Sequence, residues 1–205
     1  MYLYPKWIRL WHLINALMFI ILIVTGLSMQ YTDKENLQYV VGFAIAVKWH
    51  NFAALILTIY YIIFVAGNLF TKNGRHYRIG KTSFLSNLIK QGRYYGWGMF
   101  KGEKHPFPVT EDNKFNPLQK ITYVLSMYVA LPLLIISGVG LLFPEIVIHK
   151  FMGVSGLLLT DLLHIIMGFF LSIFMIIHIY TCTLGSKPTT LFWGMITGYH
   201  RSDEH

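Results

Sequence analysis

Four long apolar stretches restrict what this sequence can fold into. They run over residues 10–30, 43–70, 118–143 and 157–184. A helix rises about 1.5 Å per residue, so each stretch is long enough to cross roughly 30 Å of lipid hydrocarbon. With 55% hydrophobic and 13% charged residues, the chain is also too apolar for an ordinary soluble domain of its length. We therefore predict an all-α integral membrane protein, a bundle of four transmembrane helices formed as one domain over residues 1–205.

The distribution of basic residues predicts how the bundle is oriented. The connection between the second and third stretches, residues 71–117, carries nine lysines and arginines, and Lys6 and Arg9 flank the first stretch. Near the other ends of the apolar stretches there are only three lysines, Lys34, Lys48 and Lys150. Because cytoplasmic segments are enriched in Lys and Arg, both termini and this basic loop are expected in the cytoplasm. The net charge of +8 is then a topology signal, and nucleic acid is not an expected partner.

The connecting segments predict little further structure. Residues 83–100 mix apolar, aromatic and basic side chains, which favours a short helix at the membrane surface. The connections on the other side, residues 31–42 and 144–156, are too short for a folded domain. The only cysteine, Cys182, excludes an intramolecular disulfide and any cysteine-based zinc or iron–sulfur site.

Four histidines lie within the apolar stretches, where ionisable side chains are costly: His12, His50, His164 and His178. The last two are 14 residues apart on one helix, which places them on one face within roughly 40° and separates them by about 21 Å along the axis. With the N-terminus inside, His12 and His178 have similar depths near the cytoplasmic face. His50 and His164 lie toward the outer face. The sequence thus predicts two pairs at two depths.

Two imidazoles from facing helices suit the two axial positions of a haem iron. Iron ligated twice by protein has no open position for oxygen or substrate, which favours electron transfer over catalysis at the metal. Zinc would instead need three or four ligands gathered at one depth. We predict two b haems, an inner one held by His12 and His178 and an outer one held by His50 and His164.

Other residues near these helices allow two interpretations each. Arg9 and Lys48 precede candidate ligands and could neutralise haem propionates, or could serve as topology charges. Four glycines could make room for flat macrocycles, although small residues also serve plain helix packing. These glycines are Gly26, Gly138, Gly140 and Gly168.

At these motifs the chain resembles a known family, the diheme cytochrome b subunits of bacterial formate dehydrogenase, nickel–iron hydrogenase and thiosulfate reductase complexes. RLWH at residues 9–12 and WHNFAAL at residues 49–55 look like the ligand motifs of the family's first and second helices. Residues 162–180 carry two histidines at the spacing of the family's fourth helix, with Gly168 four residues after the first. The resemblance covers nearly the whole chain.

The resemblance implies an electron-transfer subunit in the bacterial inner membrane. Such subunits exchange electrons between a quinone, menaquinone or ubiquinone, and an iron–sulfur or multihaem partner subunit, and quinone chemistry can take place on the cytochrome itself. KFNPLQK at residues 114–120 is similar to the family's entry into helix three, which implies a quinone pocket at Asn116 and Gln119 near the inner haem. From the residues alone, Asn116 before Pro117 could equally be a helix cap.

Two other functions remain open at the level of sequence. One is a self-sufficient diheme oxidoreductase that acts on superoxide or ferric iron, with the same four ligands. The other is a haem-free membrane anchor or transporter with structural histidines. Co-purification of a redox subunit would favour the electron-transfer subunit, and an absent Soret band in haem-supplied preparations would favour the anchor.

Overall fold

The computed structural model describes residues 1–32, 40–80, 83–111, 113–184 and 188–199. Most of this part of the chain is helical. In chain order the elements are α1 (Lys6–Tyr31), α2 (Phe43–Phe70), η1 (Lys72–Tyr77), α3 (Phe84–Arg93), η2 (Tyr94–Gly98), η3 (Met99–Lys101), α4 (Pro117–Leu125), η4 (Ser126–Ala130), α5 (Leu131–Leu142), η5 (Pro144–Ile146), β1 (Lys150–Phe151), β2 (Val154–Ser155), α6 (Gly156–Cys182) and α7 (Thr190–Thr197).

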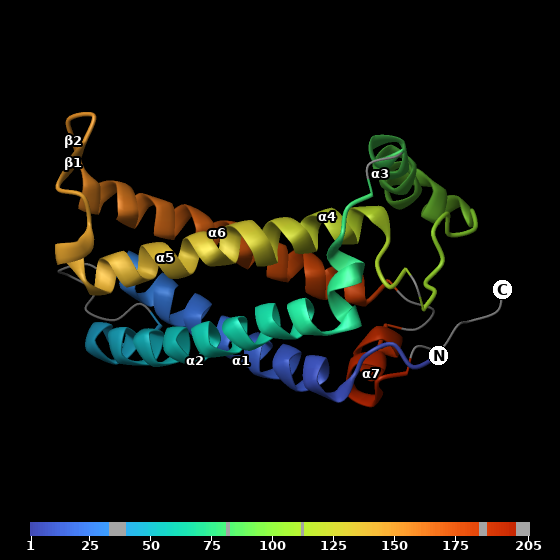
Figure 1. Cartoon of the computed structure of the whole chain (residues 1–205), viewed down its shortest axis with the longest axis horizontal. Helices are drawn as coiled ribbons and strands as arrows, with labels where there is room; N and C mark the ends of the chain where they lie inside the picture. The colour runs from blue at the N-terminus through green and yellow to red at the C-terminus, as the bar shows by residue number, and fades with distance from the viewer. Residues whose placement is uncertain (33–39, 81–82, 112, 185–187, 200–205) are drawn as a thin grey trace.

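Four helices are long and apolar enough to cross a membrane, which confirms the predicted fold class. They are α1, α2, the continuous run of α4, η4 and α5, and α6. Figure 1 shows that the N-terminus, α3 and α7 lie at one end of the bundle, which we call the loop end, and the β1–β2 turn at the other, the hairpin end. The observed spans match the predicted ones within a few residues. The main difference is that α1 begins at Lys6, with Pro5 as its N-cap residue.

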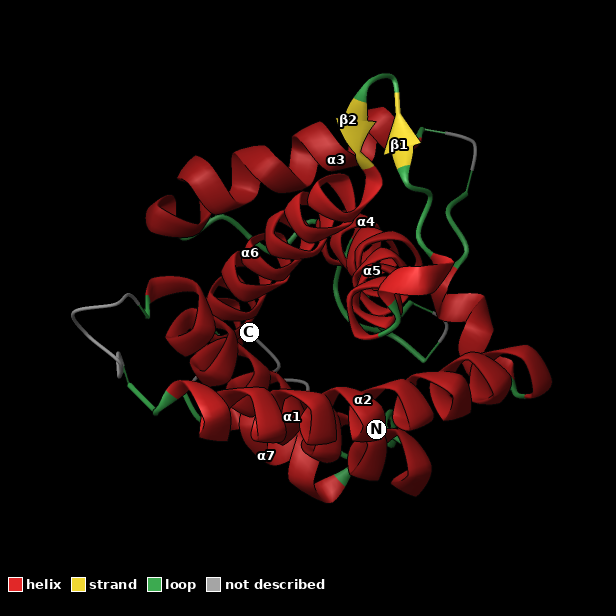
Figure 2. Cartoon of the chain, turned by 90° about the vertical axis from the view of Figure 1, so that its left-hand side faces the viewer, coloured by secondary structure: helices red, strands yellow, loops and turns green. Residues whose placement is uncertain are grey.

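The bundle consists of two helix pairs. α1 packs along α2 and α5 packs along α6, and a view along the bundle shows the pairs facing each other (Figure 2). The α1–α2 contact follows a repeat of three and four residues, which is the pattern that keeps one seam of each helix against its partner. The buried residues of the two helices follow this repeat; they are Ile8, Trp11, Asn15, Met18, Thr25 and Ser28 on α1 and Ala46, Ala53, Leu57, Phe64 and Asn68 on α2.

The third span contains a widened turn. Residues 126–130 form a π-helical turn, in which the Leu131 amide bonds the Ser126 carbonyl instead of the carbonyl four residues back. Pro132 follows directly; its ring would clash with a carbonyl one turn earlier and it has no amide hydrogen to offer. The widened turn lets one apolar helix continue through a proline.

An apolar layer crosses the middle of the bundle and joins all four spans. Its largest buried members are Met18 of α1, Leu57 of α2, Leu131 of α5 and Leu171 of α6. Leu171 is 2% exposed and lies seven residues after His164 and seven before His178, on the same helix face. The layer therefore separates two halves of the bundle interior.

Three short elements complete the fold. The predicted surface helix is present as α3, extended by η2 and η3. At the hairpin end, β1 and β2 form a two-stranded antiparallel turn that the sequence pattern did not reveal. The helix α7 was also not predicted; Gly198 at its end accepts hydrogen bonds from the Leu3 and Tyr4 amides at 2.9 and 3.2 Å, which fastens the tail to the N-terminal segment.

Candidate haem-binding site

The first predicted pair lies between α1 and α6 in the loop-end half of the bundle. His12 is two turns into α1, and His178 lies one turn before the end of α6. Their ring centroids are 6.0 Å apart and the ring planes are inclined by 59°. His12 lies beside the seam residue Trp11, whose indole N–H donates to the Tyr60 carbonyl at 2.9 Å and fixes this turn of α1 against α2.

The second predicted pair lies between α2 and α6 in the hairpin-end half. His50 is two turns into α2 and His164 two turns into α6. Their ring centroids are 6.2 Å apart, with ring planes at 64°. The structure thus brings together the residues that the depth argument paired, and both pairs have nearly the same separation.

Hydrogen bonds orient His164. Its Nδ1 is 3.1 Å from the Leu134 carbonyl and 3.1 Å from the Ser137 hydroxyl oxygen. A carbonyl only accepts, so Nδ1 carries the proton and donates. The Ser137 hydroxyl donates its own hydrogen to the Leu133 carbonyl at 2.7 Å, and so its oxygen is available as an acceptor. The Nε2 lone pair of His164 is therefore available for a metal.

His50 is oriented by the same chemistry on another helix. Its Nδ1 is 3.0 Å from the Thr25 hydroxyl oxygen. Thr25 donates to the Ile21 carbonyl at 2.6 Å, which leaves its oxygen to accept from the imidazole. A hydrogen-bonded Nδ1 that fixes the ring and directs Nε2 outward is the usual support of a metal-ligating histidine.

The surroundings of His178 include two residues that the sequence reasoning missed. The Tyr123 hydroxyl oxygen lies 3.4 Å from His178 Nδ1, and the Cys182 sulfur lies 3.9 Å from Nε2. Cys182 is one helical turn after the histidine and could have been found from that spacing. Tyr123 comes from α4, and nothing in the sequence pattern singles it out.

Two of the four candidate glycines lie against the histidine rings. A Cβ added at Gly138 would stand 3.1 Å from His164 Cε1, and one added at Gly26 would stand 3.6 Å from His50 Cε1. A Cβ at Gly168 would meet only Leu134, at 3.9 Å. Gly140 instead serves helix packing, because its neighbours are Thr160 and Val147.

The separation within each histidine pair would suit two imidazoles that hold one haem iron. Two imidazoles that bind one ion from opposite sides, with metal–nitrogen bonds of about 2.0 Å, have ring centres about 6 Å apart. The observed separations of 6.0 and 6.2 Å have this value. Among the described residues, no three His, Cys, Asp or Glu side chains gather in a group that could hold a metal ion. Each pair thus offers two nitrogen ligands.

The two cations considered for propionate contact differ in their surroundings. Arg9 lies one turn before His12, and its Nε is buried with no hydrogen-bond partner in the described part of the chain. A buried guanidinium nitrogen without an acceptor suits a carboxylate partner. Lys48 is exposed near the start of α2, as a topology charge would be.

Asn116 caps α4, as one of its two interpretations predicts. Its Oδ1 accepts from the Gln119 amide at 2.9 Å, and Gln119 Oε1 accepts from the Asn116 amide at 3.2 Å, a reciprocal capping box. Asn116 is buried, and its Nδ2 donates to the Tyr95 hydroxyl at 2.9 Å, which ties α4 to η2. Burial raises the pKa of Tyr95, so this hydroxyl stays protonated at neutral pH.

Comparison with known proteins decides the family. Residues 3–198 match the family described as prokaryotic cytochrome b561. The chain belongs to this family. The cytochrome b561 family consists of membrane helical bundles and implies haem b binding, so the chain is a multi-pass membrane cytochrome, and the resemblance noted in its sequence is confirmed.

A curated relative agrees with this assignment. The chain is 41% identical over 204 residues to a protein described as “Putative cytochrome YdhU” from Escherichia coli (strain K12). The match covers 98% of this chain and 74% of that protein. No solved structure gave a significant match.

Proposed function

We propose that this b561-family chain is a diheme electron-transfer subunit, with His12 and His178 holding one haem b and His50 and His164 the other. The observation that carries the proposal is the repeated geometry: two histidine pairs of nearly equal separation, on either side of one apolar layer. The spacing along α6 separates the pairs by about 21 Å, which spans most of the hydrocarbon.

The protein residues have defined tasks in this proposal. Bound haem b, held by these histidines, would supply one-electron redox chemistry. Thr25 and Ser137 hold the Nδ1 protons of His50 and His164, which keeps Nε2 of each ring deprotonated. Arg9 would donate to a propionate carboxylate of the haem between His12 and His178.

We also propose a quinone contact at Asn116 and Gln119, supported by their position relative to His178. Asn116, Gln119 and Tyr123 recur at three- and four-residue intervals along one face of α4. Tyr123 reaches His178, so this face leads from the capping amides toward the histidine pair at the loop end. A quinone carbonyl would compete with the Tyr95 hydroxyl for the Asn116 Nδ2 donor.

The membrane orientation and the partner are part of the same proposal. The basic connection between α2 and α4 and the N-terminal segment lie together at the loop end (Figure 1), which by the charge rule is cytoplasmic in a bacterial inner membrane. An iron–sulfur or multihaem partner subunit would then exchange electrons at the hairpin end, near the His50–His164 pair. The chain acts throughout as one membrane domain.

Haem content and reducibility test this function together. We expect two b haems per detergent-purified chain by pyridine haemochrome assay, and reduction of both by a quinol analogue in reduced-minus-oxidised spectra. No haem in a haem-supplied preparation would refute the diheme assignment. Two haems that dithionite reduces but no quinol reduces would keep the haem sites and remove the quinone site.

A further inference from the structure

A cavity of about 560 Å³ opens at the loop end of the bundle, apart from both histidine pairs. Three junctions line it: the segment that leads into α1, the turn that follows α2 and the stretch that precedes α4. It is an open hollow and not an enclosed chamber. Helix α2 ends at Phe70, and the next residue, Thr71, lines the cavity. The cavity therefore lies at the end of this apolar span.

The polar part of the cavity wall is basic. Lys72, Arg75 and Lys114 line it, against one acidic residue, Glu111. The backbone carbonyl of Glu111 accepts from the Arg75 guanidinium at 3.3 Å. Lys114 is half-buried, and its Nζ donates to the Asn73 side chain at 3.3 Å. Burial, and then the positive charge of Arg75, lower the pKa of Lys114, so the two cations are close enough to repel each other.

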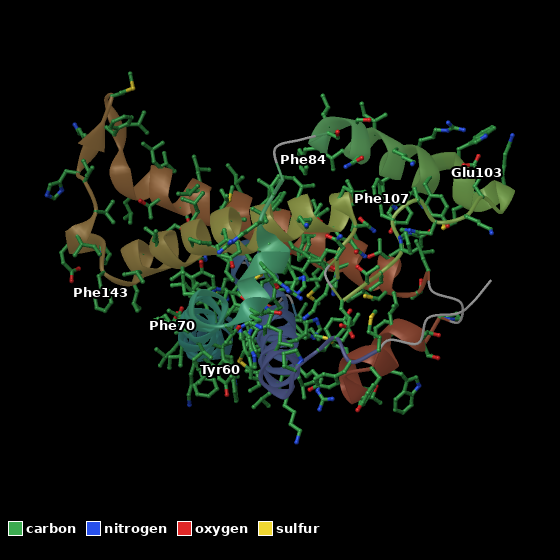
Figure 3. All side chains as sticks on the ribbon, turned by 45° about the vertical axis from the view of Figure 1, so that its right-hand side comes forward. Tyr60, Phe70, Phe84, Glu103, Phe107 and Phe143 are labelled. Atoms are coloured by element: carbon green, nitrogen blue, oxygen red, sulfur yellow. The ribbon has the colours of Figure 1, made fainter. Side chains whose placement is uncertain are left out.

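The rest of the wall includes the polar residues Thr71, Asn73 and His76, and it also has an apolar part. Leu3, Pro5 and Trp7 contribute to it, and Trp7 is held against α2 because its ring packs on Gly67, where an added Cβ would approach to 2.6 Å. Leu69 and Phe70 directly precede the lining residue Thr71 in the chain; they are 74% and 88% exposed, and Figure 3 shows Phe70 at α2. The site thus combines a cationic part with an apolar exit.

We propose that this cavity binds an anionic phospholipid, with the phosphate near Lys72, Arg75 and Lys114 and the acyl chains along Leu69 and Phe70. Basic pockets at helix ends on the cytoplasmic side suit anionic headgroups, and each nearby cation adds to the attraction. A free phosphate would satisfy the cations, but only a lipid would also place acyl chains against the apolar part of the wall and the exposed side chains at the end of α2. The lipid accounts for both features.

Thermal unfolding of the holoprotein in detergent, with added lipid, tests this proposal. Phosphatidylglycerol or cardiolipin is expected to raise the unfolding temperature saturably, whereas phosphatidylcholine and inorganic phosphate should not. The variant Lys72→Gln/Lys114→Gln should need about tenfold more anionic lipid for half of the effect. The control Lys101→Gln/Lys104→Gln removes the same charge from the same loop, outside the cavity, and should titrate like the parent protein.

A conservative variant separates charge from folding. Lys72→Arg/Lys114→Arg keeps both cations and should restore the lipid response, while the Soret spectrum of every variant reports whether the bundle is intact. Equal weakening in the cavity and control variants would overturn the proposal, because it would indicate general surface attraction. An equal effect of phosphatidylcholine would also overturn it, and saturable stabilisation by inorganic phosphate would replace the lipid with a free anion.

Discussion

At the scale of single residues, the hydrogen bonds on Nδ1 decide how the histidines can act. The hydroxyls of Ser137 and Thr25 each donate a hydrogen bond to a backbone carbonyl one turn back. The oxygen of each hydroxyl can then accept a hydrogen bond from an imidazole. The two rings are on different helices, and the same arrangement supports both. Such supporting contacts commonly change the affinity of a metal site by about 10 to 100-fold.

On the proposed diheme assignment, the double variant Thr25→Val/Ser137→Ala should therefore weaken the binding of haem between His50 and His164. We expect about 10-fold or greater loss of haem affinity at this pair, or a shift of its midpoint potential, with the other haem unchanged. Spectroelectrochemical titration of both haems measures this. Thr58→Val is the control, because Thr58 also donates to a carbonyl one turn back, at 2.8 Å, and is not among the hydroxyls that contact a histidine. An equal shift in the control would argue against the role.

Removal of single ligands tests the pairing itself. His178→Ala should lose the haem that it shares with His12 and leave much of the other, so the haem content should fall from two to about one per chain. His50→Ala should also lower the haem content to about one per chain, but it should retain the haem between His12 and His178. Pyridine haemochrome assay with low-temperature difference spectra distinguishes the two. Loss of both haems from either variant would contradict two independent sites.

At the scale of elements, the N-terminus of α4 carries two possible roles that substitution can separate. Ser and Asn are comparable helix caps, while Ala lacks the capping oxygen and costs about 1 kcal/mol. Asn116→Ser should thus keep the cap and lose only the Nδ2 bond to Tyr95, at a cost of about 1 kcal/mol; Asn116→Ala should lower the stability further and also lower quinol oxidation. If Asn116 contacts quinone, Asn116→Ser will raise the KM for a quinol analogue several-fold. An unchanged KM would leave Asn116 as a cap only.

The exposed surface of helix α3 has an apolar side and a polar side. Leu85 and Ile89, one turn apart, are 70% and 66% exposed, while Ser86 and Lys90 are exposed on the adjoining side. An amphipathic segment of this kind is expected to lie in the membrane interface. In a Cys182→Ser background, a nitroxide at Ile89→Cys should be more accessible to oxygen and one at Ser86→Cys to a water-soluble nickel complex. Equal water access at both would place α3 outside the lipid.

At the scale of the whole molecule, the central apolar layer lies between the two histidine pairs. Leu171 contributes to it from α6 and packs with residues of the other three spans. Leu171→Ala should lower the thermal stability by about 2 kcal/mol or more, because partial collapse leaves a cavity between four helices. It should also broaden the redox transitions of both haems. Leu55→Ala, at a side chain 59% exposed on α2, should have little effect in thermal unfolding and redox titration.

Much of the architecture was determined by the sequence alone, because its causes are local. The thickness of the hydrocarbon demands about 20 apolar residues per span, and the four spans were found within a few residues of their observed ends. The depth of each histidine follows from its position in a span, and so does the spacing of His164 and His178 on one face. The confirmed family membership rests on the same motifs.

The tertiary structure decided what depends on residues far apart in the chain. The hydrogen bonds of His50 to Thr25 and of His178 to Tyr123 come from neighbouring helices, so no local pattern encodes them. The fastening of α7 to Leu3 joins the two ends of the chain, and the basic cavity forms only where three junctions meet. Hydropathy fixes how long a helix is and how deep a residue lies, whereas rotation and packing of the helices determine which side chains meet.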